Sequence, residues 1–451
     1  MCRLTVITIF MLLLGISRQG VAQEQGSFSR YDSETYRYYL EQKWDSLIHT
    51  GKEALRDEID YYYLRMRLGI AYYSKRNYRK AATHFTRALE WNHQDPAALE
   101  YLYYCRIYAG QKEQADLLRK RFRGDLALKM PPPQPAFFGM SGIEYLYSHN
   151  LNREILENPD EFVSAPVPGV RYITSGFSNI SASLSNAIAP GISLEHAYTF
   201  LSKKNLYDYF DGISRYMTTA QQVRQHQYYL SPRLTTLSGL TLIPAFHVIR
   251  LRYQVFADAG TGYQGGNNMI LVFQEKTDFL AGLALKQRIG PVDIHLGGYF
   301  TELNDMEQIQ SRTGLTWYPL GNLNFYAGGF ANSLYRIGTG EGTLNFIPEI
   351  LIGFSIAEKV WIELNASSGE MDQYVENYGA IIYNSYGENP GKKAGLSVSV
   401  PVSKTGSMLY LGGRWAEYRS RFIPFDPGLV DQGNAITYHT ISIYGGLSWK
   451  F

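Results

Sequence analysis

The last twelve residues of the chain alternate between two kinds of side chain. The sequence TISIYGGLSWKF (440–451) places Ile441, Ile443, Leu447 and Phe451 on one set of alternate positions, with mostly polar or small residues on the other set. Because successive side chains of a β-strand point to opposite faces, the pattern predicts a strand with one apolar and one polar face. The fold must therefore accommodate a two-faced strand that runs to the final residue.

The same alternation recurs in segments of about ten residues throughout residues 136–451. VDIHLGGYF (292–300) and VWIELNAS (360–367) both show it. Short links such as RIGPV alternate with long polar ones, and the long ones are residues 149–171, 203–222, 369–390 and 422–435. Tight turns at one end and long loops at the other are typical of a transmembrane β-barrel. A soluble β-sandwich also alternates, but it has no reason to keep its short turns at one end.

We expect 14 antiparallel strands in this region. Twelve or sixteen are the alternatives, because residues 223–237 are irregular and NYGAIIYNSYG (377–387) can extend a hairpin. An open sheet edge in lipid leaves backbone groups unsatisfied, so the last strand is expected to pair with the first. The expected strands are residues 136–148, 172–185, 191–201, 223–237, 240–257, 268–287, 291–302, 307–318, 322–335, 343–357, 359–368, 391–402, 407–422 and 437–451.

The N-terminus, residues 1–22, predicts a secretory signal peptide. Arg3 precedes an apolar run over residues 4–16, and Gly20 and Ala22 occupy the −3 and −1 positions of a cleavage site. The run is short for a transmembrane helix, which needs about 20 residues. A buried helix or a membrane anchor is the alternative interpretation.

Residues 30–125 change to the 3.6-residue period of helices and contain a repeat. KWDSLIHTGKEAL (43–55) aligns with NYRKAATHFTRAL (77–89) at an offset of 34 residues. A 34-residue period with small residues at fixed helix positions is the tetratricopeptide signature, so this part resembles that family. An unrelated helical bundle is the alternative. The residues that carry the motif are Leu68, Gly69, Tyr72, Tyr78, Ala81, Phe85 and Ala88.

A proline-rich linker is expected over residues 126–135, where PPPQP cannot continue a helix and favours a stiff spacer. The predicted fold class is therefore α + β and multidomain. Its parts are a signal peptide (1–22), a tetratricopeptide-like helical domain (30–125), the linker (126–135) and an antiparallel transmembrane barrel (136–451).

The inward face of the barrel is expected to carry charge of both signs. With histidine neutral, five of these residues are acidic and five are basic, whereas a pore selective for one sign of charge would show a bias. The two interpretations are a weakly selective passage and a salt-bridge network that fills a closed barrel. The predicted inward residues are Glu144, Glu195, Arg250, Arg252, Asp278, Lys286, His295, Arg312, Glu349, Glu363 and Arg414.

No catalytic, metal or cofactor site is predicted, and we expect that the protein is not an enzyme. The histidines of the barrel region occur in no serine-, aspartate- or metal-centred motif. GTGEG (338–342) has the glycines of a phosphate loop but lacks the lysine and the helix that such loops need.

The chain ending resembles the C-terminal signal of Gram-negative outer-membrane proteins, which the barrel-assembly machinery reads, through Leu447, Trp449 and Phe451. The order of parts is similar to that of exopolysaccharide-export porins and, more loosely, of YaiO-type proteins. The resemblance implies an outer-membrane barrel in contact with lipid, with its N-terminal domain in the periplasm. Those exporters carry more repeats, however, and a basic lumen is expected for acidic glycans, so no substrate is carried over.

Two functions follow as expectations. In the first, the helical domain recruits a periplasmic protein partner in surface assembly or envelope export, with Tyr38, Tyr39, Tyr72 and Tyr73 as candidate contacts. The alternative for these rings is packing between helices. In the second, the barrel itself is a passive or export pore for glycan or small solutes. The charge balance of 43 basic and 41 acidic residues gives no sign of nucleic-acid binding.

Overall fold

The structure is a computed structural model that describes residues 26–162, 167–261, 267–337, 343–384, 386–403, 406–426 and 435–450. The expected signal peptide and Phe451 lie outside these ranges. The chain forms two compact units. One extends to Pro132 and includes Pro319–Leu323; the other comprises Pro133–Tyr318 and the residues from Asn324 onward. None of the helices in the described ranges is both long and apolar enough to cross a membrane.

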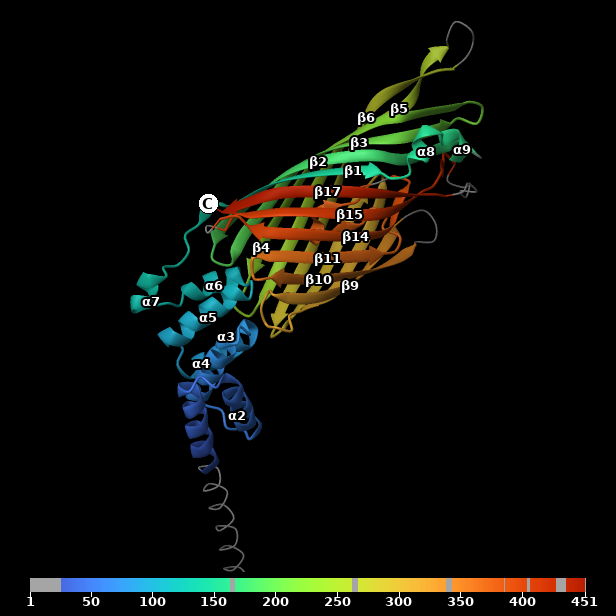
Figure 1. Ribbon diagram of the computed structural model, residues 1–451. Coiled ribbons are helices and arrows are strands. Elements are labelled where there is room, and N and C mark those ends of the chain that lie inside the picture. Colours follow the sequence, from blue (N-terminus) through green and yellow to red (C-terminus); the bar gives the residue numbers. More distant parts are fainter. Residues whose placement is uncertain are drawn as a thin grey trace, which may run out of the picture. The chain divides into compact units, whose positions relative to one another are not determined.

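The first unit is helical, and from α2 to α6 each helix packs on the next one along the chain (Figure 1). Asn77 and Asp95 accept hydrogen bonds from backbone amides of the helices that follow them, which is the usual role of these residues at a helix start. The helices are residues 26–40, α2 (Trp44–Arg56), α3 (Tyr62–Ser74), α4 (Tyr78–Trp91), α5 (Pro96–Tyr108), α6 (Lys112–Arg119) and α7 (Gly124–Lys129).

Small residues let α3 and α4 approach closely. A Cβ atom on Gly69 of α3 would lie 2.7 Å from the Phe85 ring of α4, and Phe85 is fully buried together with Ala81 and Ala88. The expected linker over 126–135 differs from the structure in its first half. Residues 126–129 belong to α7, because Leu126 is buried against the helical core, and the irregular stretch begins only at the prolines.

The second unit has 14 long strands within the described ranges (Figure 1). Short elements interrupt their links: α8 (Arg153–Glu157), α9 (Pro159–Phe162), β12 (Val375–Glu376), the 3₁₀ turn η1 (Asn377–Gly379), β13 (Ile381–Ile382) and β16 (Ile423–Pro424). The long strands are β1 (Ala136–Asn150), β2 (Gly169–Ala189), β3 (Ile192–Phe210), β4 (Arg215–Thr235), β5 (Leu240–Thr261), β6 (Asn267–Ile289), β7 (Val292–Leu303), β8 (Met306–Trp317), β9 (Phe325–Ile337), β10 (Leu344–Ile356), β11 (Val360–Ser368), β14 (Glu388–Pro401), β15 (Met408–Ser420) and β17 (Ile436–Lys450).

The sheet closes on itself. All neighbours are antiparallel, and β17 pairs with β15 on one side and with β1 on the other, where Ile143 lies opposite Leu447 and Met140 opposite Lys450. The prediction of a closed barrel of 14 strands is confirmed. The closure also explains why the chain ends in a strand, since this strand supplies the backbone groups that complete the sheet.

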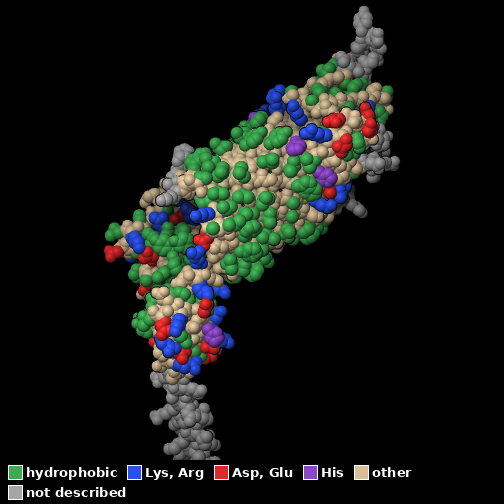
Figure 2. Space-filling model, in the orientation of Figure 1, with side chains coloured by type: hydrophobic (Ala, Val, Ile, Leu, Met, Phe, Trp, Pro, Cys, Tyr) green, Lys and Arg blue, Asp and Glu red, His purple; other side chains and the backbone are tan. Residues whose placement is uncertain are grey.

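The outer face of the barrel is apolar. Ile350, Leu411 and Ile443 are 57%, 58% and 66% exposed there, and Figure 2 shows hydrophobic side chains over the visible wall. In the same view, charged side chains of the barrel gather toward the end that carries α8 and α9. An apolar band around a closed antiparallel sheet is the surface that a lipid bilayer requires.

Two segments that were expected to be long loops have a different structure. Residues 203–222 lie mostly in β3 and β4, which continue to a four-residue turn at 211–214. Their polar composition arises because this hairpin continues with inward polar side chains, such as Asn205, which donates a hydrogen bond to Gln221. The other is the link between β11 and β14, which folds into the barrel.

Candidate functional site in the barrel interior

The link from β11 to β14, residues 369–387, enters the barrel and is called the inserted segment here (residue 385 is not described). Side chains of the wall satisfy its backbone. Gln310 donates to the Val375 carbonyl at 2.7 Å and accepts from the Val375 amide at 2.9 Å, and His247 Nδ1 lies 2.9 Å from the Gly379 carbonyl. A loop can be buried only when its polar backbone groups have partners, and these side chains supply them.

Apolar contacts hold the middle of the inserted segment against β4 to β7. Val375, Tyr378 and Ala380 pack with a cluster that includes Tyr229 and Ala245. Gly379 adopts a φ of 91°, and a Cβ at this position would lie 3.0 Å from the Ala245 side chain. The wall is therefore apolar on its inner face here, which is unusual for a barrel with a water-filled lumen.

This apolar inner wall explains the two residues that the sequence prediction placed on the wrong face. Arg250 and Arg252 were expected inside, but both side chains are exposed on the outer face of β5, where Arg250 Nη2 lies 2.7 Å from Glu275 Oε2. Their inward neighbours are Ile249 and Leu251, which are buried. With apolar side chains on both faces of β5, the alternation does not tell the faces apart.

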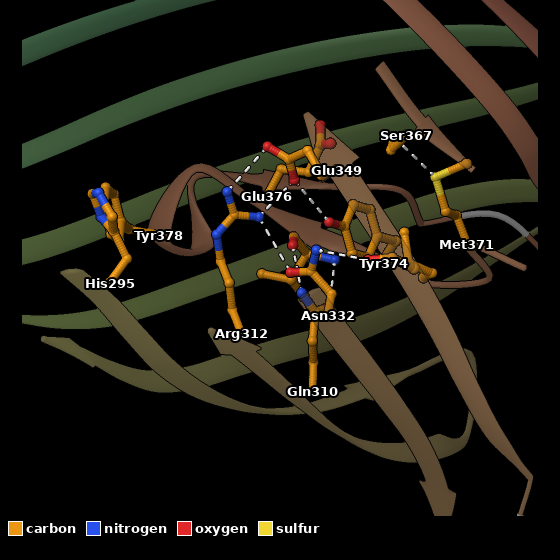
Figure 3. A network of polar contacts seen from close by, with 12 residues as sticks. His295, Gln310, Arg312, Asn332, Glu349, Ser367, Met371, Tyr374, Glu376 and Tyr378 are labelled. Carbon is orange, nitrogen blue, oxygen red and sulfur yellow. Dashed lines mark hydrogen bonds and ion pairs between the residues drawn. The ribbon is translucent and has the colours of Figure 1, made fainter. Parts of the chain in front are cut away.

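A partly buried ion pair also holds the inserted segment, at Tyr374 (Figure 3). Arg312 of β8 and Glu349 of β10 make two contacts, Nη1 to Oε2 at 2.6 Å and Nη2 to Oε1 at 3.0 Å. Tyr374 of the inserted segment donates to Glu349 Oε2 at 3.2 Å, and the Arg312 guanidinium lies 4.0 Å from the centre of the Phe330 ring. Arg312 and Glu349 thus join two wall strands to the inserted segment.

The remaining predicted inward residues also have partners. Their charged contacts are Glu195 with Arg233 at 2.6 Å, Lys286 with Asp293 at 2.9 Å, and Arg414 with the Tyr383 hydroxyl at 2.9 Å. Asp278 accepts from Asn384 at 3.0 Å, Glu363 accepts from Tyr326 at 2.8 Å, and His295 Nδ1 lies 2.8 Å from the Tyr378 hydroxyl. Glu144 lines a cavity. Glu195 with Arg233, and Lys286 with Asp293, therefore place charges of opposite sign next to each other inside the barrel.

Two cavities remain beside the inserted segment. The inner cavity, about 330 Å³, is lined by the inserted segment and by inward residues of β1–β5, β15 and β17, and it extends as far as Ser183 of β2 and Tyr410 of β15. The outer cavity, about 860 Å³, lies at the opposite end of the barrel, next to the β7–β8 turn. Lys203, Gln225 and Asn384 line both. The two cavities therefore adjoin on one side of the barrel interior.

A buried carboxylate lies at the junction of the two cavities. Glu388 is 1% exposed; Lys203 Nζ is 2.6 Å from its Oε2, and the Tyr438 hydroxyl donates to its Oε1 at 2.5 Å. The sequence prediction missed Lys203 and Glu388 because both fell in expected loops. For Lys203 a signal existed, since it lies eight residues after Glu195 and therefore shares its inward face.

In the helical unit, the candidate tyrosines mostly pack between helices. Tyr72 stacks on His84 with ring centres 5.3 Å apart, and burial, with the nearby Arg65 guanidinium, lowers the pKa of His84 to about 4. Tyr73 packs edge-on against other tyrosine rings, and Tyr38 and Tyr39 pack against the core. The exposed tyrosine rings considered next belong to other residues than the four predicted contacts.

Tyr36 and Tyr63 are 50% and 64% exposed, and both flank the Arg67 guanidinium. Together with Asp32, Tyr39, Met66 and Ile70 they line a surface hollow of about 400 Å³. Tyr39 is thus the one predicted contact residue that lines this hollow.

Other sequence predictions have simple outcomes. Of the C-terminal signal residues, Leu447 lies on the outer face and Trp449 lies opposite Ser141, while Phe451 is outside the described ranges. GTGEG (338–342) is outside them as well. Over the part of the chain that the structure describes, no three His, Cys, Asp or Glu side chains gather in a way that could hold a metal ion.

No protein-family model and no curated protein matches the chain. Among solved structures, the toluene transporter TodX of P. putida aligns over 73% of this chain and 95% of its own, with 8% identity and a TM-score of 0.42. A FadL homologue of Pseudomonas aeruginosa aligns over 69% and 90%, with 8% identity and a TM-score of 0.39. These values are too low for any ligand or residue role to be carried over to this chain.

Proposed function

We propose that the protein is a porin-like channel of a Gram-negative outer membrane that passes small polar solutes. The observation that carries the proposal is the pair of adjoining cavities along one side of the barrel interior, joined at Lys203 and Gln225. The apolar outer face fits contact with outer-membrane lipid. The C-terminal strand fits insertion by the barrel-assembly machinery. In this proposal the barrel has no enzymatic role and needs no cofactor.

The paired charges of the lumen support a weakly selective passage. Arg312 with Glu349, and Lys286 with Asp293, leave little net charge to favour one sign of ion. The inserted segment occupies the side of the lumen where these pairs lie. The passage is therefore narrow, and its width depends on how firmly the inserted segment is held.

The test is single-channel recording of the purified full-length protein in planar lipid bilayers. A second protein replaces residues 371–384 with a short Gly-Ser link, and both are checked for folding by heat-modifiable migration on gels. We expect a small conductance for the natural chain and a several-fold larger one for the replacement. A folded natural chain that never conducts would overturn the channel, whatever the replacement does.

We also propose that the helical unit, with its tetratricopeptide-like sequence, lies in the periplasm and binds a protein partner there. The hollow at Tyr36, Tyr63 and Arg67 favours this role, because exposed tyrosine and arginine are typical of binding hot spots. Changing Tyr36 and Tyr63 to Ala should abolish co-purification of periplasmic partners and leave the conductance unchanged. Changing the exposed Leu128 to Ala is the control. Partners retained by the double variant would refute this role for the hollow.

A further inference from the structure

The outer cavity is lined by a row of aromatic rings that comes from three strands. Tyr172 of β2 and Tyr207 of β3 stack with ring centres 4.9 Å apart, and Tyr207 stacks on Phe256 of β5 at 5.1 Å. Tyr209 continues the row, 6.0 Å from Phe256. All four residues line the cavity, and Tyr172, Tyr209 and Phe256 remain partly exposed. The row offers flat apolar surface to a molecule inside the barrel.

Amide side chains lie beside these rings. The six that line the outer cavity are Asn205, Gln221, Gln225, Gln274, Asn304 and Asn384. Asn205 is 4% exposed, and its Nδ2 donates to Gln221 Oε1 at 3.0 Å, while Gln221 Nε2 donates to the Gln254 carbonyl at 2.6 Å. This chain of hydrogen bonds fixes the orientation of the Asn205 amide.

Three of these amides are open to the cavity. Gln274 is exposed, and Asn304 and Asn384 are partly exposed. Their polar atoms can therefore exchange hydrogen bonds with a molecule in the cavity.

The cations of the cavity are compensated. Lys203 Nζ lies 2.6 Å from Glu388 Oε2, and Lys276 Nζ lies 2.6 Å from Asp305 Oδ2. An acidic ligand would have to compete with these carboxylates. A purely hydrocarbon ligand would remove water from the exposed amides without replacing its hydrogen bonds, and the desolvation of unpaired polar groups is costly. The ligand that fits both observations is uncharged, has a ring with an apolar face, and carries hydroxyl groups.

We propose that the outer cavity binds a neutral saccharide. Its sugar ring stacks its C–H face on Tyr209 and Phe256, and its hydroxyl groups hydrogen-bond to the amides of Gln274, Asn304 and Asn384. The volume of about 860 Å³ falls in the roughly 300–1,000 Å³ range of ligand pockets. The inference deepens the proposed channel function and rests on it, since it names the solute class that the channel takes up at this end.

The test is isothermal titration calorimetry on the full-length protein in detergent, with three probes: maltotriose, tri-galacturonic acid and toluene. We expect binding of maltotriose only. Tyr209→Ala should weaken it about tenfold, and Tyr209→Phe, which keeps the ring, should bind like the natural chain. Gln274→Leu should weaken binding about tenfold as well, because it removes an exposed amide from the wall of the cavity. The control is Tyr145→Ala, at an exposed tyrosine of β1 that lines neither cavity.

The outcomes separate this inference from the channel itself. Binding of toluene or of the acidic trimer in preference to maltotriose would overturn the saccharide site. Conductance without binding of any probe would also overturn it and leave the channel intact. Saccharide binding by a folded chain that never conducts would overturn the channel and keep the site. Variants that lose heat-modifiable migration are replaced by Tyr209→Leu and Gln274→Met, for which the same tenfold loss is expected.

Discussion

The two sides of the barrel interior are built from the same kind of strand, but one side is filled by the inserted segment and the other leaves a cavity. On the filled side, β5–β10, the inserted segment packs on apolar residues such as Ala245 and on the pair Arg312–Glu349. On the open side, β1–β4 with β15 and β17, polar residues such as Ser181 and Gln227 line a cavity. The filled side stabilises the fold, whereas the open side leaves room for a solute. Four predictions test this division, from the largest expected effect to the smallest.

The largest effect is expected from a single change on the filled side. Glu349→Leu leaves the Arg312 guanidinium, which is only 13% exposed, without its carboxylate; breaking a fully buried pair costs about 3–5 kcal/mol, and we expect the lower end of that range. Urea unfolding in detergent micelles measures the loss. The matched control is the double variant Arg312→Met with Glu349→Leu, which removes both charges and should lose much less stability. A double variant as unstable as the single one would show that the ion pair is not what matters there.

The outer face of the filled side should respond differently. Ile352 is 38% exposed on β10, three residues from Glu349, and points outward. Ile352→Arg places a charge in the apolar band, at a cost of roughly 2–4 kcal/mol near mid-membrane. The measurement is the folded fraction in lipid vesicles, with Ile352→Leu as the control. Full folding of the arginine variant would mean that this face does not contact lipid.

Most of the wall could be predicted from the sequence, because every strand that crosses the lipid alternates apolar outward residues with inward ones. Segments such as residues 292–300 alternate clearly, and the need to close the sheet accounts for the pairing of β17 with β1. The face of Arg250 and Arg252 could not be predicted, since the inserted segment makes the inner wall apolar as well. A single sequence does not show which polar link folds inward.

The site was predictable only where the alternation was clear. Arg312, Glu349 and His295 lie on an unambiguous polar face. In the structure Arg312 pairs with Glu349, Tyr374 donates to Glu349, and His295 lies beside the Tyr378 hydroxyl. Asn205, Tyr207 and Tyr209 were not predicted, because β3 continues to Phe210 whereas its expected end was residue 201. Tyr172 and Phe256 fell within expected strands, but alternation alone does not show which rings of different strands contact one another.

A smaller effect is expected at Gly379, where the inserted segment meets the filled side. Its φ of 91° favours glycine, and a Cβ would lie 3.0 Å from the Ala245 side chain and 3.1 Å from that of Leu280. Gly379→Val should therefore cost about 1–3 kcal/mol, mostly by loosening the inserted segment. We expect faster proteolysis within residues 369–387 and larger current fluctuations. Gly298→Val in β7, where a Cβ meets nothing within 4 Å, is the control, and equal behaviour of both variants would argue against a tightly packed inserted segment.

The smallest effect on stability is expected on the open side, where a change should alter conduction instead. Glu144 lines the inner cavity, so Glu144→Gln removes one negative charge from the wall of the passage without changing the size of the side chain. Cations should then be less favoured, and the reversal potential in a KCl gradient should shift toward that of an anion-selective pore, while the unfolding free energy changes by less than about 1 kcal/mol. Glu157→Gln in α8, an exposed residue that lines neither cavity, is the control and should leave the reversal potential unchanged. An unchanged reversal potential for Glu144→Gln would mean that ions do not follow the open side, and the division between the two sides would then describe packing only.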